Sequence, residues 1–186
     1  RRNANYCWLD ERDRPQTIGP LSAFAGNAGV LLRAYTYARL IGGEGMRRIS
    51  DFSTLNSNYL EARLAHAGFE IAYPKRRASH EFIVTLKHLK EETGVTAWDV
   101  AKRLLDKGFH APTMYFPLLV PECLLIEPTE TESKQTLDEF VAAMKDVLDE
   151  AHRQAELVTS APHATPVGRL DEVKAAREPD LAWRRT

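Results

Sequence analysis

The chain has 186 residues, of which 44% are apolar and 27% are charged, and this composition is ordinary for a globular domain. Its formal net charge is −1, so it lacks the basic excess with which proteins bind nucleic acid or anionic membranes. No apolar run approaches the ~20 residues that a membrane-spanning helix needs. The two cysteines, Cys7 and Cys123, lie far apart and without metal-ligand spacing, which favours a reducing cytoplasm. We therefore predict a cytoplasmic protein with no nucleic-acid partner, no membrane contact and no metal site.

The first third of the chain predicts an irregular arm followed by two helices. Residues 1–25 form the arm, and the chain opens on Arg1 without an initiator methionine, as a fragment of a longer protein would. The glycine-rich start Gly26–Gly29 opens a helix that Gly42 and Gly43 should break. A second helix then runs to about residue 66, and Gly68 closes it. Apolar residues follow helical spacing in both helices: Val30, Leu31, Ala34, Tyr35, Ala38 and Ile41, then Met46, Ile49, Phe52, Leu55, Tyr59, Leu60 and Leu64.

Two short strands should come next. Residues 69–73 and 81–86 are the candidates, and the second is rich in the Phe, Ile, Val and Thr that strands prefer. A basic loop from Pro74 to Ser79 joins them. Residues 87–95 are predicted to be a charged turn.

The stretch from Thr96 onward predicts a helix, a polar loop and a strand. Thr96 is the N-cap of the helix, and Asp99 three residues later completes a capping box. Gly108 is placed to end that helix in a left-handed turn. The next residues include Pro112, Pro117 and Pro121 and cannot be regular throughout, whereas the apolar run Cys123–Ile126 suits a buried strand.

The C-terminal part predicts a long helix, a loop and a short helix. Thr129 and Glu132 have the spacing of a second capping box. One face of the long helix behind them is marked by Leu137, Phe140, Val141, Met144, Val147, Leu148 and Ala151. A short helix over residues 170–177 has Asp171 and Glu172 in its first turn, where the helix dipole favours acids.

These elements predict an α+β fold with a small mixed or antiparallel sheet and helices on one face. Such a sheet cannot cover the remaining apolar surface of the leading helices. We therefore expect a larger partner to cover that surface.

Residue spacing leaves the chemistry open. The six histidines include no pair at a zinc-like helical spacing. Amides at Gly26–Gly29 suit either an anion or a plain helix start. His80 suits a structural hydrogen bond or a site, and the proline-pinned loop with His110 and Thr113 suits a rigid connector or a site wall. Glu127, at the end of the predicted strand, suits a structural ion pair or a site carboxylate.

Several sequence blocks in one order resemble the glycine-decarboxylating P-protein of the glycine cleavage system, in its bacterial split form and within that form the second subunit. The resemblance covers nearly the whole chain. Its blocks are Gly26–Tyr35, Leu55–Leu60, His80–Phe82, Asp99–Leu104, Gly108–Pro117, Glu127–Glu132 and Ala161–Val167.

That resemblance implies the C-terminal small domain of a fold-type I (aspartate aminotransferase-like) pyridoxal-phosphate enzyme. Long leading helices would precede a small, mainly antiparallel sheet covered by helices. The implied division is an arm at 1–25, linker helices at 26–68, an α+β small domain at 69–160 and a tail at 161–186. The whole enzyme would decarboxylate glycine with pyridoxal 5′-phosphate and pass the aminomethyl group to the lipoyl arm of the H-protein. Its partners would be P-protein subunit 1, in a heterotetramer, and lipoylated H-protein.

One departure from the family limits what this chain can do. The Schiff-base lysine of the family follows a histidine and precedes a run of glycines, and this sequence has no His-Lys pair. The resemblance therefore implies a chain without a catalytic residue, without bound cofactor and inactive alone.

The resemblance also implies roles for matching positions. Asn27 would lie on the cofactor side. His80, His110 and Thr113 would face the glycine or lipoyl channel, and Glu127 and Thr129 would fix the loop beneath. All of these residues could instead pack structurally. Two alternatives remain for the whole chain: a non-catalytic α+β interaction module, or the small domain of another fold-type I enzyme.

Overall fold

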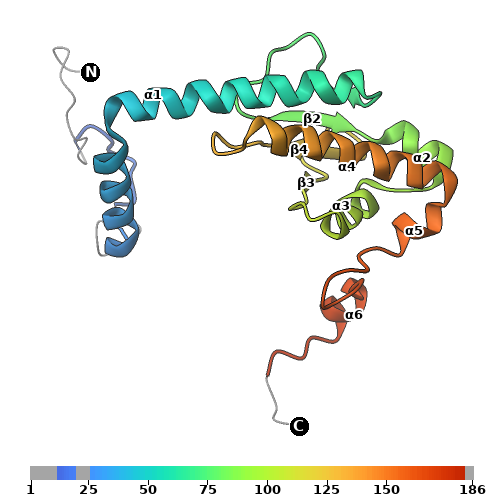
Figure 1. Cartoon of the computed structure of the whole chain (residues 1–186). Coiled ribbons are helices and arrows are strands. Elements are labelled where there is room, and N and C mark those ends of the chain that lie inside the picture. The colour runs from blue at the N-terminus through green and yellow to red at the C-terminus, as the bar shows by residue number, and fades with distance from the viewer. Residues whose placement is uncertain (1–11, 20–25, 183–186) are drawn as a thin grey trace. The chain divides into compact units, whose positions relative to one another are not determined.

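The structure is a computed structural model that describes residues 12–19 and 26–182 (Figure 1). It separates into two units, Arg1–Met46 and Arg47–Thr186. Most of the predicted arm at 1–25 lies outside the described residues, as does Cys7, whereas Cys123 is a buried free thiol.

Helix α1, Ala28–His66, begins in the first unit and continues into the second. Asn27 caps its start, because its side-chain oxygen accepts a hydrogen bond from the Val30 amide at 3.1 Å. Two separate helices were expected, and α1 does consist of two helical segments that meet in a kink at Gly42, whose φ of 65° and ψ of 177° are not helical. The predicted break is therefore confirmed. Apolar side chains of the first half are exposed: Val30, Leu31, Leu32, Tyr35, Tyr37 and Leu40.

A four-stranded antiparallel sheet lies in the second unit, with the order β1-β2-β4-β3. Its strands are β1 (Glu70–Ile71), β2 (Phe82–Thr85), β3 (Thr113–Met114) and β4 (Cys123–Ile126). Strand β4 has the predicted bounds, and β1 and β2 fall inside the predicted ranges. The two-residue edge strand β3 had no sequence signal, because a run that short has no alternation to read.

Helix α2, Lys87–Thr93, replaces the predicted charged turn, and that prediction was wrong. Its charged side chains lie outward, while Leu89 is buried at 5% exposure. Gly94 then ends the helix in the left-handed conformation, and its amide donates to the Lys90 carbonyl. A single buried leucine in seven residues is too little for a periodic pattern.

Helix α3, Ala97–Asp106, follows the predicted pattern. Thr96 and Asp99 form the capping box, with both reciprocal hydrogen bonds present. Gly108 lies in the left-handed region with φ of 83°, and the Phe109 amide donates back to the Leu104 carbonyl at 3.0 Å.

Replacing Gly108 with alanine is expected to lower the free energy of unfolding by about 1 kcal/mol, because a Cβ strains a residue with this φ. No neighbouring atom lies within 4 Å of the position that the new Cβ would take, so the loss comes from the backbone alone. Urea denaturation measures it. The control is Gly168→Ala, where φ lies outside the left-handed region and the nearest atom is 3.8 Å away. Equal losses at the two positions would contradict the left-handed turn.

Helix α4, Lys134–Arg153, begins at Ser133, whose hydroxyl accepts from the Thr136 amide at 3.1 Å. The predicted capping box of Thr129 and Glu132 is therefore wrong. The Thr129 hydroxyl instead lies 2.7 Å from that of Thr131. Helices α5 (Ala155–Thr159) and α6 (Glu172–Arg177) follow, and Asp171 caps α6.

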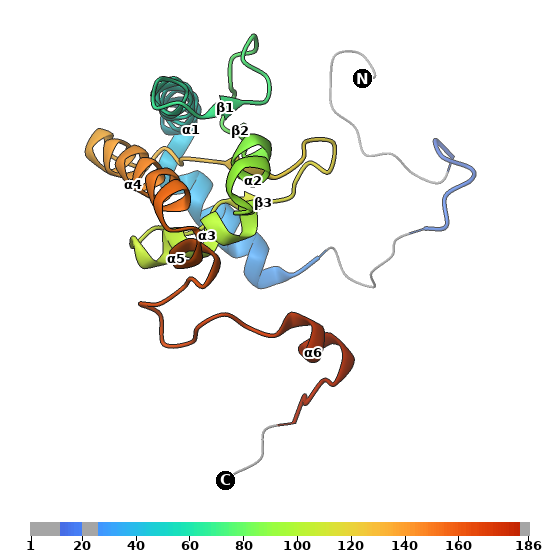
Figure 2. The same ribbon diagram turned by 90° about the vertical axis from the view of Figure 1, so that its right-hand side faces the viewer.

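The core of the second unit lies between one face of the sheet and the helices. Val84 and Leu124 are paired across β2 and β4 and are fully buried. Figure 2 shows α4 and the second half of α1 on the same side of β2. The core also takes Leu60 and Leu64 from α1, Val100 and Leu104 from α3, and Leu137, Met144 and Val147 from α4. This is the predicted α+β architecture, with helices on one face of a small antiparallel sheet.

None of the helices among the described residues combines the length and the apolar content needed to cross a bilayer.

Candidate functional site

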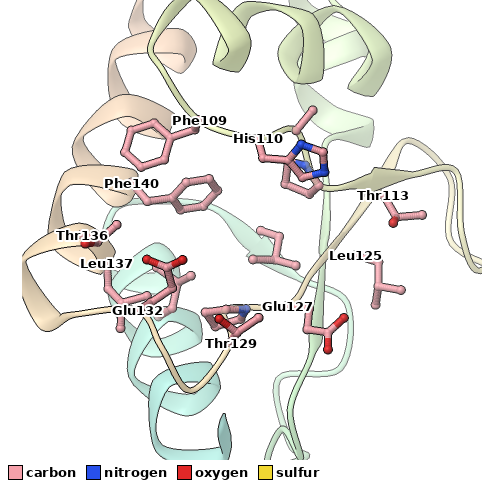
Figure 3. A pocket seen from close by; sticks show the side chains of 15 residues that line it. Phe109, His110, Thr113, Leu125, Glu127, Thr129, Glu132, Thr136, Leu137 and Phe140 are labelled. Atoms are coloured by element: carbon pink, nitrogen blue, oxygen red, sulfur yellow. The ribbon is translucent and has the colours of Figure 1, made fainter. Parts of the chain in front are cut away.

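A cavity of about 390 Å³ lies in the second unit (Figure 3). It is bounded by α1, by α4, by the loop that precedes β3 and by the loop that follows β4. It is lined by Leu60, Phe109, His110, Ala111, Pro112, Thr113, Leu125, Ile126, Glu127, Pro128, Thr129, Glu132, Thr136, Leu137 and Phe140.

One side of the cavity is apolar. The rings of Phe109 and Phe140 meet edge to face, with centroids 5.3 Å apart and planes at 79°. The left-handed turn at Gly108 delivers Phe109 from the end of α3, while Phe140 comes from the second turn of α4. Leu60 of α1 and Leu137 of α4 extend this wall. The wall suits a hydrocarbon chain or a ring.

The other side carries polar groups from two loops (Figure 3). His110 lies in the loop after α3, and Thr113 begins β3, where it pairs with Leu125 of β4. Glu127 and Thr129 follow the end of β4. Because β3 and β4 are neighbours in the sheet, these two loops meet at one place. Residues that carry hydroxyl, imidazole and carboxylate groups thus line a partly apolar hollow.

The first turn of α4 is held against α1 beside the cavity. The Tyr59 hydroxyl donates to the Asp138 carboxylate at 2.6 Å, and the Lys134 ammonium donates to the same carboxylate at 2.6 Å. The hydrogen bond from Lys134, followed by that from Tyr59, lowers the pKa of Asp138. Asp138 therefore stays ionised at neutral pH and keeps both donors.

Four of the predicted site residues meet in this cavity: His110, Thr113, Glu127 and Thr129. Glu127 is exposed, so burial does not demand an ion pair for it. Their roles in a channel stay predictions.

The other two predicted residues lie elsewhere. His80 is exposed and does not line the cavity; its Nδ1 lies 3.1 Å from the Ser79 hydroxyl and its Nε2 3.9 Å from the Glu81 carboxylate. Ser79 and Glu81 line a second cavity of about 190 Å³, which shares Leu125 with the first. Asn27 belongs to the first unit, where its side chain caps α1. A role for either residue at the site remains a prediction.

Sequence reasoning missed several residues of the site. Glu132 and Thr136 line the cavity and had been assigned to helix capping or to no role. Asn56 of α1 supports the wall from behind, because its amide donates to the carbonyls of Thr129 and Glu132. A signal for Asn56 did exist, since it lies four residues before Leu60 and hence on the same helix face.

The residues that line the cavity cannot anchor pyridoxal phosphate covalently. No lysine is among its lining residues, so within the described part of the chain it offers no amine for a Schiff base. Across residues 12–19 and 26–182 there is also no cluster of three His, Cys, Asp or Glu side chains able to hold a metal ion.

Comparison with known proteins identifies the relatives of this chain. Residues 49–164 match the family model described as glycine dehydrogenase, C-terminal domain. A probable glycine dehydrogenase (decarboxylating) subunit 2 from Nitrosospira multiformis is 71% identical over 182 residues, which are 98% of this chain and 36% of the relative. The corresponding Methylococcus capsulatus protein is 64% identical over 179 residues, 96% of this chain and 37% of that protein.

A solved structure is also similar. It is a crystal structure of glycine decarboxylase (P-protein) of the glycine cleavage system in inhibitor-bound form, with 25% identity and a TM-score of 0.57. The alignment covers 68% of this chain and 28% of that one. This chain thus spans little more than a third of the length of its curated relatives. The match over residues 49–164, with the agreeing fold, shows that the chain belongs to the glycine dehydrogenase C-terminal domain family.

Proposed function

We propose that this chain is the C-terminal part of subunit 2 of a glycine-decarboxylating P-protein, and that the cavity beside Phe109 and Phe140 forms one wall of the channel for the lipoyl arm of the H-protein. The observation that carries the proposal is one of position. Every residue that lines the cavity falls within residues 49–164, the range that matches the family.

The chemistry of the cavity supports a lipoyl arm as its occupant. A lipoyl arm is a long hydrocarbon chain with a polar amide, and the cavity pairs an apolar wall at Phe109 and Phe140 with a polar side at His110 and Thr113. Glu127 and Glu132 add negative charge, which attracts the cationic aminomethyl group that the arm would carry away. In this proposal Glu127 and Thr129 fix the loop beneath the arm.

The whole protein would supply what this chain lacks. Pyridoxal phosphate, the electron sink for loss of CO2 from glycine, would be held by the part of the subunit that precedes this chain. His80 would lie along the approach to the site and Asn27 on the cofactor side. The assembly would include P-protein subunit 1 in a heterotetramer, and it would act in the bacterial cytoplasm on glycine and lipoylated H-protein.

The exposed apolar side chains in the first half of α1 support a larger assembly. Six large apolar side chains between residues 30 and 40 are exposed, more than scattered surface residues would explain. The remaining length of the curated relatives, almost two thirds, supplies a surface to cover them.

The test is a chimera in which this chain replaces the matching part of the Nitrosospira multiformis subunit. We expect no release of CO2 from carboxyl-labelled glycine by this chain alone. The chimera, assembled with subunit 1 and given pyridoxal phosphate and lipoylated H-protein, should release CO2 at a rate within about tenfold of the natural relative. The natural assembly is the positive control. A folded, assembled chimera that releases none would contradict the proposal.

A further inference from the structure

One face of α1 packs against the cavity. Leu60 lines it directly, and Asn56 lies one turn earlier on the same face. Asn56 is only 9% exposed. Its side-chain amide donates to the carbonyl oxygens of Thr129 at 2.9 Å and Glu132 at 3.1 Å.

These two hydrogen bonds hold the two ends of the turn from Thr129 to Glu132. Thr129 and Glu132 both line the cavity, and the turn between them is closed by the Glu132 amide, which donates to the Thr129 carbonyl at 3.3 Å. Both ends of that turn are thus held to a side chain more than seventy residues earlier in the sequence. A loop held at two carbonyls by one rigid helix keeps a fixed distance from that helix.

The same helix holds the first turn of α4 by a separate contact. Tyr59, three residues after Asn56, donates its hydroxyl to Asp138. Thr136 and Leu137, which line the cavity, lie just before Asp138. Asn56 is therefore the contact that locates the loop, while Tyr59 locates the helix that follows it.

We propose that Asn56 is a positioning residue that sets the width of the cavity between α1 and the Thr129–Glu132 turn, and thereby the affinity for the lipoyl arm. This inference rests on the proposed function. It assigns no contact between Asn56 and a substrate, because Asn56 acts through the two carbonyls.

A matched control lies two residues further along α1. The Asn58 amide also donates to two carbonyls, those of Thr54 and Ala78, both at 2.8 Å. It ties down the loop before β2, which is no part of this cavity. Asn58→Ala therefore removes one hydrogen bond within α1, to Thr54, and one from α1 to a loop, at Ala78, without touching the cavity wall.

The test compares Asn56→Ala with Asn58→Ala in the assembled chimera described above. Three quantities are measured: the Kd for lipoamide by equilibrium dialysis without glycine, the KM for lipoylated H-protein and the KM for glycine. We expect Asn56→Ala to raise the Kd and the KM for the lipoyl carrier about tenfold, because the turn is then no longer held at its distance from α1. The KM for glycine should change less than about twofold. Asn58→Ala should change none of the three, although it also removes a hydrogen bond between α1 and a loop.

Equal lipoamide affinity in the two variants would overturn the inference, as would an unsubstituted assembly that binds no lipoamide. If lipoamide binding depends on Asn56 but no CO2 is released, the inference stands and the proposed activity fails. Should Asn56→Ala not fold, Asn56→Gln keeps both donors on a side chain one methylene longer and displaces the turn. It should then raise the Kd for lipoamide, and an unchanged Kd in that folded variant would count against the inference.

Discussion

Replacing Leu124 with alanine is expected to lower the free energy of unfolding by about 3–4 kcal/mol, the cost typical of deleting a large buried side chain. Leu124 is fully buried. It lies in β4 between β2 and β3 and pairs with Val84 on one side and Met114 on the other. Helices α1, α3 and α4 contribute side chains to the same core, so close packing leaves little room for the cavity to collapse.

The matched control for this substitution is Leu118→Ala, in the loop just before β4. Leu118 is 89% exposed, so its loss should change stability by no more than about 0.5 kcal/mol. Urea denaturation of both variants, monitored by circular dichroism, gives the two free energies. Similar values for the two leucines would mean that β4 is not the centre of the core.

Leu124 and Leu118 also show why β4 could be predicted from the sequence. The run Cys123–Ile126 is apolar throughout and is preceded by Pro121, so a short buried strand was the natural prediction. The exposed Leu118 and Leu119 differ from Leu124 only in their neighbours, since prolines at 117 and 121 prevent regular pairing. Local chemistry was sufficient at these positions.

Long-range contacts account for the errors. Thr129 and Glu132 have the spacing of a capping box, but Asn56 binds the carbonyls at both positions and the helix starts later, at Ser133. No local pattern reports a partner more than seventy residues away. Helix α2 was missed for a different reason, because its only buried side chain is Leu89 and its stability comes from packing on the core.

The candidate site was predictable only in part for the same physical reason. His110, Thr113, Glu127 and Thr129 were named from their blocks, and the pairing of β3 with β4 brings their loops together. Phe140 and Leu60 also line the cavity, but they look like ordinary core residues in the sequence. Their part in the site follows from the packing of α1 and α4 and from nothing in their own segments.

The second large effect is expected at Glu150, which joins α4 to α3. Its carboxylate accepts from Arg103 Nε at 2.8 Å, from Arg103 Nη2 at 3.1 Å and from Lys107 Nζ at 2.8 Å. The Glu150 side chain is 21% exposed and that of Arg103 is 13% exposed. Replacing Glu150 with glutamine removes the charge from a largely buried cluster and should lower stability at pH 7 by about 2 kcal/mol.

The loss should depend on pH in a defined direction. Hydrogen bonding from Arg103 is the main reason that the pKa of Glu150 lies below its ordinary value of 4.5. A carboxyl whose pKa is lower in the folded protein stabilises the fold fully above its unfolded pKa, and this contribution disappears as the pH falls through the folded value. The difference between wild type and Glu150→Gln should therefore be largest above about pH 5 and shrink steadily below about pH 4.

Urea denaturation of both proteins between pH 7 and pH 3 measures this difference. The control is Glu139→Gln, which changes an exposed carboxylate on the same helix that accepts from the Gln135 amide at 2.7 Å. It should change stability by less than about 0.5 kcal/mol at any pH. If the Glu150→Gln difference stayed constant down to pH 3, the charge of Glu150 would not be what holds α3 to α4. Packing of the Glu150 side chain would then be the remaining explanation, because its contribution to stability does not depend on the protonation of the carboxyl group.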